Sequence, residues 1–201
     1  MGEAGTGAAE PQDAGGDGAA VGTRAAPEHT VHRLTAGEFR GCVPALGALL
    51  AAVVADGASL GFLTPFAPAE AARWWRDQEP AVACGRLAVW VARERPGGPL
   101  AGTVGLVREP KPNGRHRAEI VKLMVHRDAR GHGLGRRLLA TAEQAAAEAG
   151  ATLLLLDTET GSAAEHLYAA AGWTRYGVVA EYAADPSGVL RDCTFFSKRL
   201  G

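Results

Sequence analysis

The sequence predicts a mixed α/β fold in which helices cover both faces of a central sheet. Short apolar and β-branched runs dominate the first half of the chain, and strand-like runs alternate with helical patterns in the second half. Turn signals such as Pro96-Gly97-Gly98-Pro99 and Pro112-Asn113-Gly114 separate these runs. Together these observations are typical of one α/β domain.

The first half of the chain is predicted to begin with a strand and two helices and to continue with three strands. We expect these elements, with the loop between the two helices, at residues 30–34, 39–54, 57–65, 68–78, 86–93, 100–108 and 118–125. Pro68 and Glu70 are typical of a helix start, and Pro44 is tolerated near the start of the first helix.

The second half is predicted to alternate helices with strands. We expect a helix that runs to about residue 149, a strand at 152–156, a helix at 162–171, and strands at 174–182 and 193–198. Asp157 ends the first of these strands, and Gly172 is a common left-handed stop for the second helix.

Length and composition indicate one domain with an N-terminal extension. The chain has 201 residues, and residues 1–27 are rich in glycine and alanine with almost no large apolar side chains. Such a segment cannot bury enough surface to order itself, so we expect a disordered tail followed by a domain at 28–201. The first six residues match a myristoylation pattern, which we interpret as a chance match in such a tail.

Charge, cysteine and hydropathy patterns exclude several classes of protein. The formal net charge of −1 argues against nucleic acid as a partner, and three scattered cysteines without a CxxC pattern favour the cytoplasm over an oxidising compartment. The histidines show no ligand spacing, so we expect no metal. No apolar run approaches the roughly 20 residues that span a bilayer, so we expect no membrane association.

The segment from Arg127 to Arg137, which we call the glycine loop, is rich in arginine and glycine and leads into the helix that runs to about residue 149. Cations at a helix start oppose the helix dipole, unless a bound polyanion makes the arrangement favourable. Glycines let such a ligand approach the backbone, and arginines add charge-assisted hydrogen bonds. The loop lacks the Gly-Lys-Ser/Thr of nucleoside triphosphate sites and follows the fourth strand, unlike a dinucleotide fingerprint. We therefore expect a different phosphate-bearing ligand.

The pattern Arg130-x-x-Gly133-x-Gly135, with the later Leu167-Tyr168-x-x-x-Gly172-Trp173, resembles the pyrophosphate loop of the GCN5-related N-acetyltransferases. The resemblance covers roughly residues 29–200 and is closest to the tabtoxin-resistance acetyltransferases, as in Ala118-Glu119-x-x-Lys122-Leu123-Met124-Val125. It implies the GNAT fold, a mixed and mostly antiparallel sheet of about seven strands with about four helices. It also implies acetyl-CoA as co-substrate.

The resemblance further implies a set of residues that contact the cofactor. In the family the fourth strand splays from the fifth, and a main-chain N–H at about Val125 faces the thioester oxygen. The implied cofactor residues are Met124, Val125, Arg130, Gly131, His132, Gly133, Leu134, Gly135, Arg136 and Ser162. Many members carry asparagine at the start of the next helix, where this chain has Gly161 and Ser162.

Three residues are candidates for the chemistry of acetyl transfer. By resemblance, Tyr168 is the general acid, and Glu119 and Asp157 act together as base and substrate anchor. The alternatives left open are a tyrosine that caps the core, a salt bridge from Glu119 to Lys122 or Arg117, and a helix-start role for Asp157. Candidate walls of the acceptor pocket are Phe62, Trp74 and Tyr182.

The sequence therefore predicts an enzyme that acetylates the amino group of a small molecule. An antibiotic or toxin is the expected acceptor, either a tabtoxinine-like β-lactam or an aminoglycoside of the kasugamycin type, which two carboxylates would suit. The alternatives are a protein or peptide N-acetyltransferase and a non-catalytic acyl-CoA sensor. An apolar final strand permits a homodimer.

Overall fold

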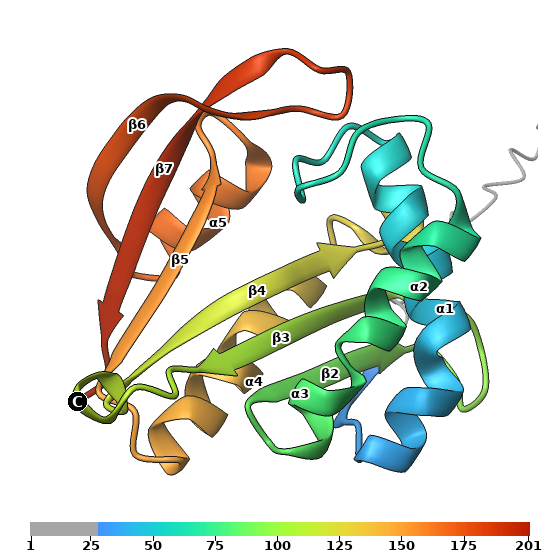
Figure 1. Ribbon diagram of the computed structural model, residues 1–201, viewed down its shortest axis with the longest axis horizontal. Coiled ribbons are helices and arrows are strands. Elements are labelled where there is room, and N and C mark those ends of the chain that lie inside the picture. Colours follow the sequence, from blue (N-terminus) through green and yellow to red (C-terminus); the bar gives the residue numbers. More distant parts are fainter. Residues whose placement is uncertain (1–27) are drawn as a thin grey trace, which may run out of the picture.

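The computed structural model describes residues 28–201, so the predicted tail and its myristoylation pattern lie outside the described residues. A sheet of seven strands runs in the order β1-β2-β3-β4-β5-β7-β6 (Figure 1). The strands are β1 Thr30–Arg33, β2 Leu87–Arg93, β3 Gly102–Arg108, β4 Arg117–Val125, β5 Leu153–Glu159, β6 Thr174–Ala184 and β7 Leu190–Arg199. The α-helices are α1 Ala36–Ala55, α2 Pro68–Asp77, α3 Glu79–Ala83, α4 Leu134–Glu148 and α5 Ala163–Ala170. Two 3-10 turns are η1 Pro112–Gly114 and η2 Arg127–Ala129.

The predicted mixed, mostly antiparallel sheet is confirmed, because β4 and β5 are the one parallel pair among the paired strands of residues 28–201. The described residues form five α-helices where about four were expected. The additional helix is α3, which follows α2 directly and has five residues. A segment this short carries too little periodicity to be recognised in a sequence.

Apolar layers cover both faces of the sheet. This is expected because β2 has buried side chains on both of its faces. On β2, Leu87, Val89 and Val91 pack with α1, α2 and α3, whereas Ala88, Trp90 and Ala92 pack on the other face with α4 and α5. Figure 1 shows α1 to α3 on one side of the sheet and α4 on the other.

Helix α1 begins three residues before the predicted start because Thr35 and Glu38 form a capping box. Thr35 Oγ1 accepts a hydrogen bond from the Glu38 N–H at 3.3 Å, and Glu38 Oε2 accepts one from the Thr35 N–H at 2.8 Å. Pro44 consequently lies inside the helix and not near its start.

Helix α1 corrects one expectation about apolar segments. By length and composition alone it is sufficient to cross a membrane, and it is the one helix of residues 28–201 that meets this test. Its 18-residue apolar window is 56% buried within the fold, with Phe39, Leu46 and Leu50 fully enclosed. The core helix of a globular domain has these properties.

Gly47 allows α1 and α2 to pack closely, and this predicts a stability effect. A Cβ at Gly47 would lie 2.7 Å from the backbone nitrogen of Ala72, whereas a Cβ at Gly41 of the same helix has nothing within 4 Å. Gly47→Ala is therefore expected to destabilise the fold by about 1–3 kcal/mol. Gly41→Ala is the matched control, expected to be neutral or stabilising by about 0.5–1 kcal/mol. Urea unfolding of both variants measures this, and equal stabilities would contradict the predicted close packing.

The strands β4 and β5 diverge after a short parallel pairing. They pair at three positions, from Arg117 with Leu153 to Glu119 with Leu155. Beyond these positions β5 continues along β7 as far as Glu159, and Figure 1 shows β4 running away from it. We call the diverging segments, residues 120–125 of β4 and 156–159 of β5, the fork. The splay implied by the family resemblance is therefore present.

A bulge in β4 changes which face its side chains occupy. The register with β3 shifts between Thr103 and Gly105, and Lys122 opposite this shift has a φ of 49°, a value that L residues rarely adopt. Before the bulge, Val121 packs with the α1 and α2 layer, whereas after it Leu123 packs with the α4 layer. A regular strand would place both side chains on one face.

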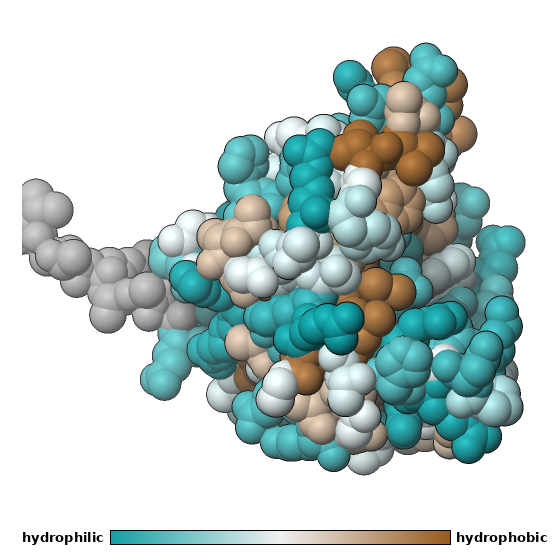
Figure 2. Space-filling model, turned by 90° about the vertical axis from the view of Figure 1, so that its left-hand side faces the viewer, coloured by the Kyte–Doolittle hydropathy of each residue, from teal (hydrophilic) through white to brown (hydrophobic). Residues whose placement is uncertain are grey.

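The hairpin of β6 and β7 extends from the sheet and meets the loop between α1 and α2. A turn at residues 185–188 lies between β6 and β7, and its Pro186 carbonyl accepts hydrogen bonds from the Thr64 N–H and Oγ1, both at 2.8 Å. Exposed apolar side chains also gather on this hairpin, at the top of Figure 2. These exposed side chains are Tyr176, Val178, Val179, Tyr182, Val189 and Leu190.

Candidate active site

The carboxylates of Glu119 and Asp157 lie on one face of the sheet, beside the fork. Glu119 pairs with Leu155 across the parallel strands, and Asp157 follows two residues later on β5, so both side chains project to the same side. Both are exposed. Asp157 lies within β5 and does not end the strand as predicted. The alternative of a helix-start role for Asp157 is therefore excluded, because Ser162 caps α5.

The surroundings of Glu119 shift its pKa upward. Desolvation raises the pKa of Glu119 above its ordinary value, the negative charge of Asp157 raises it further, and the ammonium of Lys122 acts in the opposite direction. Within residues 28–201 Glu119 forms no ion pair within 4.0 Å, and Arg117 pairs instead with Glu109 at 2.8 Å. A carboxylate with a raised pKa near a second carboxylate has the properties of a general base.

Lys122 is a member of this cluster that sequence reasoning considered only as a salt-bridge partner. Its Nζ donates a hydrogen bond to the Leu60 carbonyl at 2.9 Å and lies over the rings of Trp74 and Phe62, 5.0 and 5.5 Å from their centroids. Burial lowers the pKa of Lys122, while Asp157 and Glu119 raise it. The bulge in β4 was the missing signal, because a strand with regular alternation places Lys122 on the opposite face.

Tyr168 approaches the fork from the other layer. It lies on α5, is 6% exposed, and packs against Trp173 and Phe196 with centroid distances of 6.0 Å. Burial, with a contribution from the charge of Asp157, raises the pKa of Tyr168 well above its ordinary value. The hydroxyl therefore stays protonated over the whole neutral range. The residue occupies a core position and also senses the charge of Asp157, so both interpretations of it have support.

Two residues of β7 that the sequence did not single out lie next to Asp157. The Cys193 Sγ donates a hydrogen bond to Asp157 Oδ2 at 3.4 Å, and desolvation together with Asp157 raises the pKa of this thiol to about 12. Phe195 pairs directly with Asp157 in the sheet, so their side chains share a face. A strand-pairing register is needed to find these neighbours, and one sequence does not contain it.

The three predicted wall residues divide into two groups. Phe62 and Trp74 contact each other edge to face at 5.6 Å and both lie beside Lys122, while Trp75, one residue later, is 1% exposed in the core. Tyr182 lies on β6 and packs edge to face against Phe195 at 5.2 Å. The α1–α2 side and the hairpin side of the fork therefore each carry aromatic side chains.

The glycine loop reaches α4 in a conformation that leaves its backbone open. Gly131 and Gly133 have φ values of 81° and 74°, and a Cβ at either position would have nothing within 4 Å. Gly133 caps α4 without any side-chain hydrogen bond to the first turn, which holds no acidic residue. Free N–H groups at such a helix start fit an anionic ligand. The residues present therefore fit the diphosphate that the resemblance implies.

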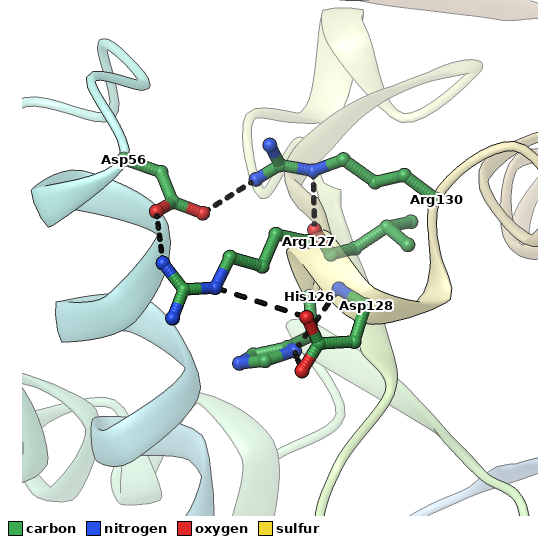
Figure 3. A network of polar contacts seen from close by, with 6 residues as sticks. Asp56, His126, Arg127, Asp128 and Arg130 are labelled. Atoms are coloured by element: carbon green, nitrogen blue, oxygen red, sulfur yellow. Dashed lines mark hydrogen bonds and ion pairs between the residues drawn. The ribbon is translucent and has the colours of Figure 1, made fainter.

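Two arginines of this loop, Arg127 and Arg130, form ion pairs with Asp56 at the end of α1. Arg130 Nη2 and Arg127 Nη1 contact the two carboxylate oxygens of Asp56 at 3.2 and 3.5 Å, and Arg130 Nε donates to the Val125 carbonyl at 3.1 Å (Figure 3). His126 Nδ1 accepts from the Asp128 N–H at 3.4 Å, a structural role in η2. Arg130 therefore shapes the loop and retains further N–H donors for an anion.

The other predicted cofactor residues have varied surroundings. Gly135 packs on α5, because a Cβ there would lie 3.4 Å from Leu167, and Arg136 Nη2 donates to the Ala170 carbonyl at 3.4 Å. Ser162 caps α5 by accepting from the Glu165 N–H at 3.2 Å. Met124 and Leu134 are buried, whereas His132 is exposed and Val125 is partly exposed.

Comparison with known proteins agrees with this geometry. The model of the Acetyltransferase (GNAT) family matches residues 57–173, a span that contains the glycine loop, Glu119, Asp157 and Tyr168. A ribosomal-protein-alanine N-acetyltransferase from Brucella melitensis is 26% identical, with 85% of this chain and 99% of that chain covered and a TM-score of 0.66.

Two further solved structures share the fold at lower identity. The yncA acetyltransferase from Salmonella typhimurium, solved with its cofactor acetyl-CoA, is 19% identical over 86% of this chain and 94% of that chain, with a TM-score of 0.67. A protein named for phosphinothricin N-acetyltransferase activity is 18% identical over 87% and 99% of the two chains, with a TM-score of 0.70.

Proposed function

The chain belongs to the acetyltransferase (GNAT) family, and from that premise we propose that it acetylates an amino group of a small antibiotic or toxin in the cytoplasm. Membership makes the chain an N-acetyltransferase with acetyl-CoA as its co-substrate. The observation that carries the proposed acceptor class is the pair of exposed carboxylates, Glu119 and Asp157, at the fork beneath a loop that is bonded to the β6–β7 turn.

Each proposed catalytic residue has a defined task in this reaction. An alkylammonium of pKa about 10 must lose a proton before its nitrogen attacks the thioester carbon, and Glu119 or Asp157 accepts that proton. The nitrogen loses its second proton to solvent as the amide forms and the C–S bond breaks. Tyr168 donates a hydrogen bond, and then a proton, to the departing thiolate, and its phenolate regains a proton from solvent. The Val125 N–H stabilises the carbonyl oxygen while it is anionic.

A small acceptor is favoured by how the site is covered. The loop at residues 57–66 is hydrogen-bonded to the Pro186 carbonyl through Thr64 and to Lys122 through Leu60. A protein substrate needs an open groove, which this connection from α1 to the hairpin obstructs. The two carboxylates attract a cationic acceptor, so a kasugamycin-type aminoglycoside or a tabtoxinine-like β-lactam fits the site, the latter as in the tabtoxin-resistance subgroup.

A thiol-release assay across a panel of amines tests the acceptor class. With acetyl-CoA present, we expect turnover of at least one member of a set containing kasugamycin, other aminoglycosides, tabtoxinine-β-lactam and phosphinothricin. Peptides with free N-termini, including an N-terminal alanine, are the contrasting set. Turnover of a peptide with none for every small amine would replace this proposal by a protein N-acetyltransferase. Binding of acetyl-CoA without turnover of either set would favour a sensor.

The proposed binding of the acetyl-CoA diphosphate by the glycine loop predicts the effect of a double substitution. Arg130→Ala with Arg136→Ala is expected to weaken acetyl-CoA binding by about tenfold or more, because charged hydrogen bonds contribute roughly 1.5–3 kcal/mol each. Arg108→Ala with Arg115→Ala removes the same charge from exposed positions at the far end of β3 and is the matched control. Calorimetric titration measures both, and equal affinities for the two doubles would remove the phosphate assignment from this loop.

We also propose that the outer edge of β6 pairs two chains into a homodimer. Among residues 28–201, β6 has no partner on its outer edge, and Val178 and Val179 of this strand are exposed to solvent. Unpaired apolar edges favour association. Light scattering of the purified protein gives the mass that decides this point.

A further inference from the structure

We propose that Lys122 is a positioning residue that holds the α1–α2 loop, residues 57–66, over the fork and thereby sets the affinity of the enzyme for its acceptor. This inference rests on the proposed function for its kinetic part only. Its structural part concerns a contact between β4 and the loop that exists without any substrate.

The backbone of Lys122 adopts a rare conformation that directs its side chain to the loop. Its φ is 49° at the β4 bulge, a conformation that glycine adopts at lower energy. Lys122 Nζ lies on the face of Glu119 and Asp157. A lysine in this conformation indicates that the contacts of its side chain compensate for the strained backbone.

The end of the Lys122 side chain makes three contacts with the other side of the fork. Nζ donates to the Leu60 carbonyl at 2.9 Å and lies over the rings of Phe62 and Trp74 at 5.5 and 5.0 Å. Phe66 stacks on Phe62 at 4.4 Å, so the ammonium holds an aromatic cluster that spans the loop and α2. Cation–π contacts are strongest where water is excluded, and this lysine is only partly exposed.

The loop is also held at Thr64, so its position depends on the Lys122 contact and on the Thr64 contact together. Thr64 donates two hydrogen bonds to the Pro186 carbonyl of the β6–β7 turn, at 2.8 Å each. Lys122 therefore fixes Leu60, Thr64 fixes the other half of the loop, and the segment between them carries Phe62, one of the expected wall residues. If the Lys122 contact is lost, the wall loses its anchor on β4.

The Lys122 ammonium also acts on the charge of Glu119, an effect that a purely structural contact would not have. The titratable groups near the Lys122 ammonium are Glu119 on β4, Asp157 on β5 and, through its hydrogen bond to Asp157, the Cys193 thiol on β7. Lys122 lowers the pKa of Glu119, so removal of its charge raises that pKa further. The acidic limb of the pH–rate profile then moves to higher pH, because the base must be deprotonated.

The test compares Lys122→Met with Lys122→Arg and with Lys111→Met, which removes an exposed lysine beyond β3. In the protein without substrate, Lys122→Met is expected to increase amide hydrogen exchange of residues 57–66 by about tenfold, whereas the arginine variant and Lys111→Met stay near the original rate. Unchanged exchange in Lys122→Met overturns the proposal, whatever acceptor the enzyme uses. Lys122→Gln provides the same comparison if the methionine variant does not fold.

The kinetic arm uses whichever amine the thiol-release panel identifies. For Lys122→Met we expect the KM for that amine to rise about tenfold with a smaller change in kcat, and an unaltered affinity for acetyl-CoA by calorimetry. The acidic limb moves to higher pH, and Lys122→Arg restores both properties. An unchanged KM and an unchanged limb would reduce Lys122 to a structural contact. A silent panel would remove the proposed acceptor class and leave the exchange result standing.

Discussion

Replacement of Tyr168 by phenylalanine is expected to lower kcat by about 10²–10⁴, the usual contribution of a general acid, with acetyl-CoA affinity unchanged. The phenyl ring keeps the packing of Tyr168 against Trp173 and Phe196, so the core retains its volume. The lost group is the hydroxyl, which has no hydrogen-bond partner within residues 28–201 and whose raised pKa keeps it protonated. The hydroxyl is therefore available as a hydrogen-bond donor to the departing thiolate.

The measurement is single-turnover acetylation of an acceptor from the panel, with calorimetry for acetyl-CoA and thermal unfolding as a check on the fold. Phe196→Leu is the matched control, because it changes the same part of the core without touching a hydroxyl. Turnover of Tyr168→Phe within about threefold of the original enzyme would make Tyr168 a core residue only.

Most of the fold was predictable because its elements depend on local patterns. The turn signals around Pro96 and Pro112, the proline at the start of α2 and the glycine after α5 each determine a boundary within a few residues. Helix α3 was missed because five residues hold no measurable period. The apolar character of α1 was underestimated because Glu38 and Arg40 interrupt its run near the N-terminus.

The candidate site was only partly predictable, and the missing part depends on strand register. Glu119 and Asp157 were paired by resemblance, whereas Cys193 and Phe195 become neighbours of Asp157 only once β5 and β7 are aligned. Lys122 escaped because the bulge in β4 reverses the alternation that a sequence pattern assumes. A bulge results from pairing with β3, so no local signal reports it.

The glycine loop illustrates the limit of an argument from charge. Positive charge at the start of α4 indicated an anion, and the open backbone at Gly131 and Gly133 agrees with that expectation. The partner of Arg130 and Arg127, however, is Asp56 at the end of α1, more than seventy residues earlier in the sequence. Asp56 neutralises part of the charge that the dipole argument counted, and only the tertiary structure contains that contact.

Removal of the carboxylate at Glu119 is expected to have an effect of similar size, a loss in kcat of about 10²–10⁴ for Glu119→Gln. The amide keeps the shape of the side chain and cannot accept a proton. Glu119 is exposed, so the fold tolerates the change, and acetyl-CoA affinity should stay as it was. Glu148→Gln, which alters an exposed carboxylate at the C-terminal end of α4 on the other side of the sheet, is the matched control and should leave kcat unchanged.

Asp157→Asn distinguishes a base from an anchor through the direction of a pH shift. Asp157 raises the pKa of Glu119, so its removal lowers that pKa and moves the acidic limb of kcat/KM to lower pH. Lys122→Met moves the same limb to higher pH, and opposite displacements are hard to explain unless Glu119 is the group that titrates. If Asp157 is the base instead, Asp157→Asn abolishes turnover at every pH and Glu119→Gln leaves much of it. A pH–rate profile of the three variants therefore assigns the proton acceptor, and a limb that none of them moves would exclude Glu119 and Asp157 from this role.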